Sequence, residues 1–332
     1  MSSENIFEAA KSGDVESLTS LIEHKVDPNA QDADDNTPLI YAAQEGHAAV
    51  VECLLKMKAT PDVAGADNWT PVFFACEQGH NELIKTLIDA KASLEICDHF
   101  GRFPLHYATM HGNLASVKVL LDAKVSVDIQ DGSGRTAFIF AAEYDHRDLL
   151  RLLLDARADI DMQDKMKSCA LSFVSDTGRI DVARFLIEAK ASIHLKDSWN
   201  KTCLISAAES GSAEIASMLI AAKATIDDQD QWNRSALMYA ARYGFADVAK
   251  VLIDAQAAVE QRSETWNALF FATIHGHGGA ARELLHAKAA LDIEDFSHMS
   301  PLMAAAENGH ADIIHLIIDE LKTRLLENPV TF

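Results

Sequence analysis

Short apolar segments alternate with polar turns along the chain, and the alternation has a fixed period of 33 residues. In one period, residues 39–45 form an apolar segment with paired alanines, and residues 48–57 form a second one. The second segment places Val50, Val51 and Leu54 on one face, because their spacing is helical. The pattern therefore predicts a polar turn and two short helices per period, and these units must stack to bury their apolar faces.

Helix-boundary residues recur with the same period. Thr37-Pro38 opens a first helix, and Thr70-Pro71 and Ser300-Pro301 occupy equivalent places. Thr or Ser caps the helix, and proline suits the first helical position, where no N–H is needed. Eight residues later a glycine ends the helix, because glycine enters the left-handed conformation freely. Asp145 takes this place once; otherwise it is held by Gly46, Gly79, Gly112, Gly178, Gly211, Gly244, Gly276 and Gly309.

This repeated unit resembles the ankyrin repeat. The signature T-P-L-H-x-A-A-x-x-G-H is nearly complete in Thr37–His47, Thr70–His80 and Ser300–His310. At 33 residues per unit, the chain of 332 residues corresponds to about ten repeats. The resemblance implies an all-α solenoid of stacked turn-helix-helix units, with β-turns projecting along one edge. It also implies binding rather than catalysis.

The repeats predict one domain over residues 1–332. Residues 1–31 form an N-terminal capping unit without a leading turn, and residues 32–294 hold eight repeats. Residues 295–332 hold a C-terminal repeat with an extended capping helix, predicted from Ala311 to about Glu327.

Charge narrows the choice of partner. The chain has 29 Lys and Arg against 50 Asp and Glu, a net charge of −21. A chain with this much negative charge repels nucleic acid and anionic membranes. We therefore expect a protein partner with a basic and apolar surface. No stretch reaches the roughly 18 apolar residues of a membrane span. Five scattered cysteines without a C-x-x-C pair fit a reducing compartment, so we expect a cytoplasmic protein, with the nucleus also compatible.

Catalytic chemistry is not expected. The recurring histidines His47, His80, His146, His277 and His310 occupy one position per repeat, so they form a row rather than a metal cluster. We interpret them as structural hydrogen-bonding residues between repeats. No phosphate-binding or nucleophile motif is present, so we expect no enzyme, no cofactor and no metal.

A row of basic residues follows the second helices, where the ankyrin family usually has glycine. If the backbone is left-handed there, each side chain costs up to ~1 kcal/mol relative to glycine. The row is either a solvated edge or a docking stripe. Gln256 interrupts it, and its members are Lys25, Lys58, Lys91, Lys124, Arg157, Lys190, Lys223 and Lys288.

Aromatic residues in the turns are the first candidates for partner contacts. Turn tips project beyond the helices, and Trp is enriched among residues that dominate binding energy. We therefore predict exposed anchors at Trp69, Phe100, Trp199, Trp232, Trp266 and Phe296. The turn aspartates are expected to steer the basic surface of the partner.

A second aromatic row lies on the predicted first helices. Its members are Tyr41, Phe74, Tyr107, Phe140, Phe173, Tyr239 and Phe271, with Ser206 as the one exception. Tyr144 and Tyr243 lie near the end of the same helices. Two interpretations remain: these rings line an acidic concave groove that binds the partner, or the seven-residue row packs between repeats.

The sequence thus favours a non-enzymatic adaptor or scaffold, monomeric by itself. One alternative is a dedicated inhibitor or assembly chaperone of one enzyme or complex, and another is a fixed subunit of a cytoskeletal or ciliary assembly. Separately, the spacing of Leu21, Asp27 and Asn29 resembles the asparagine-hydroxylation context of ankyrin proteins, so Asn29 is a candidate modification site.

Overall fold

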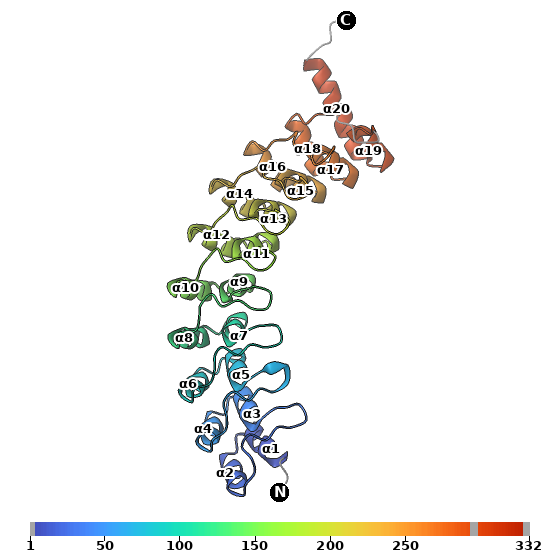
Figure 1. Cartoon of the computed structure of the whole chain (residues 1–332). Helices are drawn as coiled ribbons and strands as arrows, with labels where there is room; N and C mark the ends of the chain where they lie inside the picture. Colours follow the sequence, from blue (N-terminus) through green and yellow to red (C-terminus); the bar gives the residue numbers. More distant parts are fainter. Residues whose placement is uncertain (1–3, 293–297, 328–332) are drawn as a thin grey trace. The chain divides into compact units, whose positions relative to one another are not determined.

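A computed structural model describes residues 4–292 and 298–327 (Figure 1). Within these ranges the regular elements are helices, with one short 3-10 helix and two isolated β-bridges. The predicted all-α fold is therefore confirmed. Contacts divide the chain into two compact units, Met1–Lys165 and Met166–Phe332, which are described separately.

The first unit is a series of helix pairs, and the 3-10 helix η1 (Ala66–Asn68) lies in one of its turns. The first helix of each pair stacks on the first helix of the next pair, and the second helices form a parallel series. The pairs are α1 (Glu4–Ser12) and α2 (Val15–Glu23), α3 (Pro38–Gln44) and α4 (Ala48–Lys56), α5 (Pro71–Gln78) and α6 (Asn81–Asp89), α7 (Pro104–Met110) and α8 (Leu114–Asp122), and α9 (Ala137–Glu143) and α10 (Arg147–Asp155).

The second unit repeats this arrangement. Its pairs are α11 (Ala170–Thr177) and α12 (Ile180–Glu188), α13 (Cys203–Glu209) and α14 (Ala213–Ala221), α15 (Ala236–Tyr243) and α16 (Ala246–Asp254), α17 (Ala268–His275) and α18 (Gly278–His286), and α19 (Pro301–Glu307) and α20 (Ala311–Glu327). Helix α20 has 17 residues, whereas α12, α14, α16 and α18 have nine each. Its bounds agree with those predicted from the sequence.

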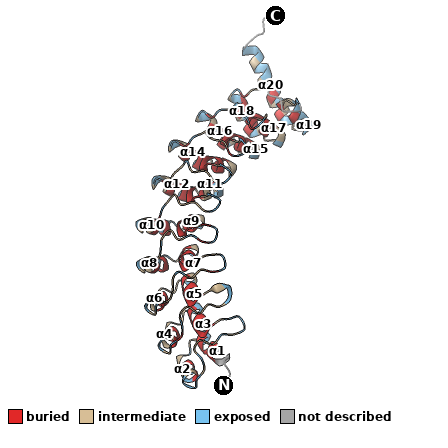
Figure 2. Ribbon diagram, in the orientation of Figure 1, coloured by how far each residue is buried: buried red, intermediate tan, exposed pale blue. Residues whose placement is uncertain are grey.

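The apolar core runs along the stacked helices of each unit. Leu39, Ala42 and Ala43 on α3 are buried, as are Val50 and Leu54 on α4. The paired alanines keep the first helices thin, so that neighbouring repeats approach closely. Figure 2 shows buried residues on the facing sides of the helices and exposed residues at their outer ends. Each repeat is therefore stabilised by its neighbours rather than by a core of its own.

Helix boundaries follow the predicted capping residues. The Thr37 hydroxyl accepts a hydrogen bond from the backbone N–H of Ile40, at 3.2 Å. Gly46 ends the repeat's first helical segment with a φ of 76°, and a Cβ there would lie 2.7 Å from the His80 ring. Asp145 adopts a φ of 62° at the equivalent position. Both left-handed geometry and the imidazole of the next repeat therefore demand glycine at position 46.

The histidine row joins neighbouring repeats, as the sequence predicts. His47 Nε2 lies 2.9 Å from the Lys11 carbonyl oxygen of the preceding repeat. His310 Nε2 lies 3.2 Å from the carbonyl oxygen of Ile274. His146 makes the equivalent 3.1 Å contact with Met110. These imidazoles are structural connections between repeats.

The basic row has the strained backbone anticipated for it. All nine positions, Gln256 included, have φ between 64° and 76°, in the left-handed region. The row therefore carries the conformational cost that glycine would avoid.

Candidate protein-binding surface

The turns are closed by their own aspartates. Asp98 Oδ1 accepts hydrogen bonds from the backbone N–H groups of Phe100 and Arg102, each at 2.8 Å. Its other oxygen accepts a 2.6 Å bond from the Tyr107 hydroxyl. Asp230 binds its own turn in the same way, with the Tyr239 hydroxyl at 2.7 Å. Each carboxylate thus ties a turn to the first helix of its repeat.

These contacts give the turn aspartates a structural role besides the steering expected of them. Asp98 and Asp230 are each only 4% exposed, and Asp131 is also buried, so these three carboxylates offer little surface to a partner. Asp32 is half-buried and accepts the Tyr41 hydroxyl at 2.5 Å. Partial burial alone would raise the pKa of Asp32, but the hydrogen bonds that it accepts outweigh this and lower the pKa. Asp295 lies outside the described residues.

Neighbouring turns are joined through their backbones. In the first unit, Gly132 N–H donates to the Phe100 carbonyl oxygen at 2.8 Å. In the second unit, Ser198 donates to Met166, and Gln231 to Trp199, both at 2.8 Å. We call the residue two positions after the turn aspartate, as Phe100 is after Asp98, the turn tip. Consecutive tips are therefore held side by side.

Three consecutive tips of the second unit carry exposed apolar side chains. Met166 and Trp232 are 44% exposed, and Trp199 is 39% exposed. We call these three residues the tip row. The exposure predicted for Trp199 and Trp232 is confirmed, as is that of Phe100, a tip of the first unit with 64% exposure. The tip row thus places three exposed apolar side chains on consecutive turns that are joined by backbone hydrogen bonds.

The other two tryptophans correct the prediction of exposure. Trp69 and Trp266 are half-buried, because they lie on rings of the first helices instead of projecting into solvent. The Trp69 ring lies 5.7 Å from Phe73 and 4.6 Å from Tyr107 of the next repeat, and the Trp266 ring lies 5.3 Å from Phe271. These tryptophans pack the repeats. Phe296 lies outside the described residues.

The second aromatic row is largely a packing element. Tyr107, Phe140, Tyr239 and Phe271 are buried and present no appreciable surface to a partner. Tyr41, Phe74 and Phe173 are half-buried, and Tyr144 and Tyr243 are exposed. Sequence reasoning missed the basic side chains above this row: Arg135 lies 5.6 Å from the Phe140 ring, and Lys201 lies 5.2 Å from the Tyr239 ring. For the four buried rings, packing between repeats is the correct interpretation.

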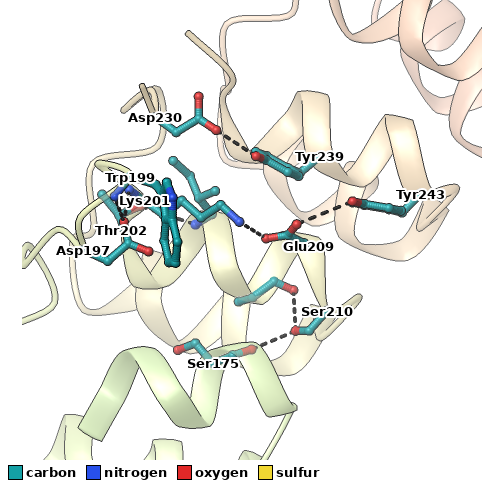
Figure 3. Close-up of polar contacts among 12 residues, drawn as sticks. Ser175, Asp197, Trp199, Lys201, Thr202, Glu209, Ser210, Asp230, Tyr239 and Tyr243 are labelled. Atoms are coloured by element: carbon teal, nitrogen blue, oxygen red, sulfur yellow. Dashed lines mark hydrogen bonds and ion pairs between the residues drawn. The ribbon is translucent and has the colours of Figure 1, made fainter. Parts of the chain in front are cut away.

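The C-terminal ends of helices α11, α13, α15 and α17 form what we call the inner face of the second unit. At its acidic end, Glu209 pairs with Lys201 and accepts a 3.5 Å bond from the Tyr243 hydroxyl (Figure 3). Desolvation and then the charge of Glu209 raise the pKa of the nearby Asp176 carboxyl. Two carboxylates, Asp176 and Glu209, therefore lie close together near α11 and α13, with Lys201 beside them.

Arg242 lies at the other end of the inner face. Desolvation and then the positive charge of Arg242 lower the pKa of His275, and His277 and His310 act in the same direction. Arg242 therefore adds a positive charge to the face on which Asp176 and Glu209 lie.

Within residues 4–292 and 298–327, no group of three or more His, Cys, Asp or Glu side chains is arranged to hold a metal ion. None of the helices in that part of the chain combines the length and apolar character that a bilayer crossing requires. Asn29, the candidate modification site, has its Oδ1 2.7 Å from the backbone nitrogen of Thr60.

Sequence comparison places the chain in a family. A profile described as "Ankyrin repeats (3 copies)" matches residues 6–96, 82–164, 170–263 and 255–326. The chain therefore belongs to the ankyrin-repeat family, whose members are generally non-enzymatic modules for protein–protein interaction. No curated protein matches the sequence significantly.

Proposed function

We propose that the second unit binds a segment of a partner protein across the tip row and the adjoining inner face, and that the chain acts as a non-enzymatic adaptor or scaffold. The observation that carries this proposal is the set of three exposed apolar tips on consecutive, hydrogen-bonded turns. Large aromatic side chains that are rigidly held lose little conformational freedom on binding, so they are effective anchors. Neighbouring repeats are spaced by roughly 10 Å, the packing distance of helices.

The charges of the inner face indicate the chemistry of the partner. Asp176 and Glu209 favour Lys or Arg beside the apolar anchors of the partner, and Arg242 favours a carboxylate further along it. Tyr243 is exposed between these charges and hydrogen-bonds to Glu209, so it is a further contact residue. We therefore propose a basic, apolar-anchored segment that binds in one direction. The net charge of −21 supports a protein partner over nucleic acid, and the five scattered cysteines, none of them in a C-x-x-C pair, support a cytoplasmic location.

The remaining predicted site residues take secondary places in this proposal. Phe100 and Tyr144 are exposed on the first unit and lie outside the proposed binding surface. The half-buried rings of Tyr41, Phe74, Phe173, Trp69 and Trp266 offer only their edges. We propose no partner contact through the four buried rings.

The test is affinity capture from cell extract with the wild-type chain and the double variant Trp199→Ala/Trp232→Ala. Partner proteins identified by mass spectrometry are then purified and titrated by calorimetry. We expect the double variant to bind about 30-fold more weakly, since hot-spot residues contribute about 2 kcal/mol or more. The expected melting temperature is unchanged.

The matched control is Phe100→Ala, which removes an exposed tip of the first unit. It should leave the affinity for the same partner unchanged. Equal binding by the wild-type chain and the double variant would contradict the proposal. Capture at two salt concentrations also reports the electrostatic share, because binding through opposite charges weakens as salt screens them.

A further inference from the structure

Helix α20 carries a row of large apolar side chains that solvent reaches. Ile314, Ile318, Leu321 and Leu325 follow one another at intervals of four, three and four residues, which places them on one side of the helix. Leu325 is 60% exposed, Ile318 and Leu321 are also exposed, and Ile314 is half-buried. We call these four residues the α20 stripe.

Polar contacts hold α20 against the preceding repeat through another side of the helix. Arg324 Nη2 donates to the Ala289 carbonyl oxygen at 2.9 Å, and Arg324 Nε donates to Glu320 at 2.8 Å. Lys288 Nζ lies 3.1 Å from Glu327 and 3.6 Å from Glu320. The additional turns of α20 are thus fixed in place, and their apolar stripe is left uncovered by these contacts.

The stripe adjoins the stacking surface of its repeat through Ile314. Met303 on α19 is 59% exposed, whereas its equivalents Ile40 and Phe73 are fully buried. The side chain of Ile40 reaches Gly65 in the turn of the next repeat. Ile314 is likewise more exposed than its buried equivalent Val51. Within the described residues, no further helix pair packs on this side of α19 and α20.

We propose that the α20 stripe joins two copies of this chain, with α20 packed antiparallel against α20 of the second copy. The intervals of four, three and four residues read the same in both directions. In the antiparallel arrangement, Ile314 meets Leu325 of the second copy, and Ile318 meets Leu321. A twofold interface requires this self-complementarity, and the spacing is that of paired helices. The dimer replaces the monomer expected from the sequence.

Charge predicts how the dimer responds to salt. Each copy carries a net charge of −21, so two copies repel each other, and the contact itself is apolar. Added salt screens the repulsion and strengthens the dimer. Binding of a basic segment to the inner face has the opposite dependence. Pairing also presents two tip rows in one particle, which favours partners with two binding segments.

The test is sedimentation velocity on the full chain from about 1 to about 300 μM, at 0.1 and 0.5 M NaCl. We expect a monomer–dimer equilibrium with a dissociation constant on the order of 10–100 μM at the lower salt concentration, because a stripe of four residues is smaller than a standard interface. The dissociation constant should fall at the higher salt concentration. A wild-type chain that stays monomeric under all these conditions overturns the proposal.

Two variants separate the stripe from the rest of the helix. Leu321→Glu/Leu325→Glu should raise the dissociation constant at least tenfold, since each copy then buries two carboxylates. Leu326→Glu is the matched control: Leu326 is 83% exposed and adjoins Leu325, but it lies off the stripe, so its dimer should persist. The proposal is also overturned if the double variant dimerises as strongly as the wild-type chain, or if the control loses as much dimerisation as the double variant. Circular dichroism checks that all chains melt alike, and Leu325→Glu alone replaces the double variant if that unfolds.

Discussion

Two pairs of turns use tryptophan for different purposes. Trp199 and Trp232 lie at turn tips and are exposed, whereas Trp69 and Trp266 lie next to the first helix and cover aromatic rings. The turns of Trp199 and Trp232 begin with an aspartate that binds backbone N–H groups. Gly65 and Ser263 occupy the corresponding position before Trp69 and Trp266. The function of a tryptophan in this chain therefore depends on its place within the turn.

Trp69 occupies a turn position whose side chain covers the aromatic row of the first helices. In other turns this position is a basic residue such as Arg135, which pairs with Glu143 at 2.8 Å and lies above the Phe140 ring. Trp69 instead contacts the rings of Phe74 and Tyr107 directly. A flat cation and a flat aromatic ring thus satisfy the same requirement, which is to cover the first-helix aromatic row.

Replacing single tryptophans tests this comparison most directly, because the expected difference in stability is the largest. We expect Trp69→Ala to lower the free energy of unfolding by about 3 kcal/mol, because it leaves a cavity against the neighbouring rings. Trp232→Ala is expected to change it by less than about 0.5 kcal/mol, as is usual for surface positions. Urea unfolding followed by circular dichroism measures both values. Equal losses would show that the tip tryptophan is also structural.

The tyrosine that ties helix to turn gives the next largest effect. Tyr107→Phe removes the hydroxyl that binds the buried Asp98 carboxylate, so we expect a loss of about 2 kcal/mol at pH 7. Burial, with the Asp98 hydrogen bond, raises the pKa of Tyr107 to about 12, whereas an unfolded tyrosine titrates near pH 10. The hydroxyl's contribution is therefore complete below pH 10 and is lost as the pH rises towards 12.

Urea titrations at pH 7, 10 and 11.5 measure this difference between the wild-type chain and Tyr107→Phe. The gap in free energy of unfolding should shrink as the pH rises, because the variant has no phenol at position 107. Tyr144→Phe is the control at an exposed tyrosine, and its stability should match the wild-type chain at each pH. A gap that stays constant up to pH 11.5 contradicts the assignment.

Replacing two lysines of one repeat by glycine is expected to give the smallest changes in stability, and it compares a left-handed position with a helical one. Lys91 has a φ of 66°, so Lys91→Gly should stabilise the chain by up to ~1 kcal/mol. Lys85 lies within α6 of the same repeat, so Lys85→Gly should destabilise it by about 1 kcal/mol. Thermal melts of both variants give the signs directly. Two changes of the same sign would show that backbone conformation does not govern these positions.

Local sequence features were sufficient to predict most of the fold. Capping by Thr37 and the left-handed backbone at Gly46 and Lys91 follow from intrinsic preferences of each residue, which depend little on distant contacts. The hydrogen bonds of His47 and its equivalents could be predicted because the 33-residue period identifies equivalent residues. Each tyrosine of the aromatic row also follows an aspartate by nine residues, as Tyr107 follows Asp98. That spacing was an available signal for their hydrogen bond.

The candidate site was less predictable, because exposure and electrostatic potential depend on neighbours that are distant in sequence. Trp69 is covered by Tyr107 of the next repeat, so its exposure depends on a residue outside its own turn. Asp176 and His275 have opposite surroundings because Glu209 faces one and Arg242 the other. The sequence determined the repeats, the helices, their boundaries and the residues that fill each position, since these follow from periodicity and short-range preferences. Only the tertiary structure decided which aromatic rings remain exposed, which charged side chains lie side by side and which apolar stripe is exposed, because each of these is set by the packing of one repeat on another.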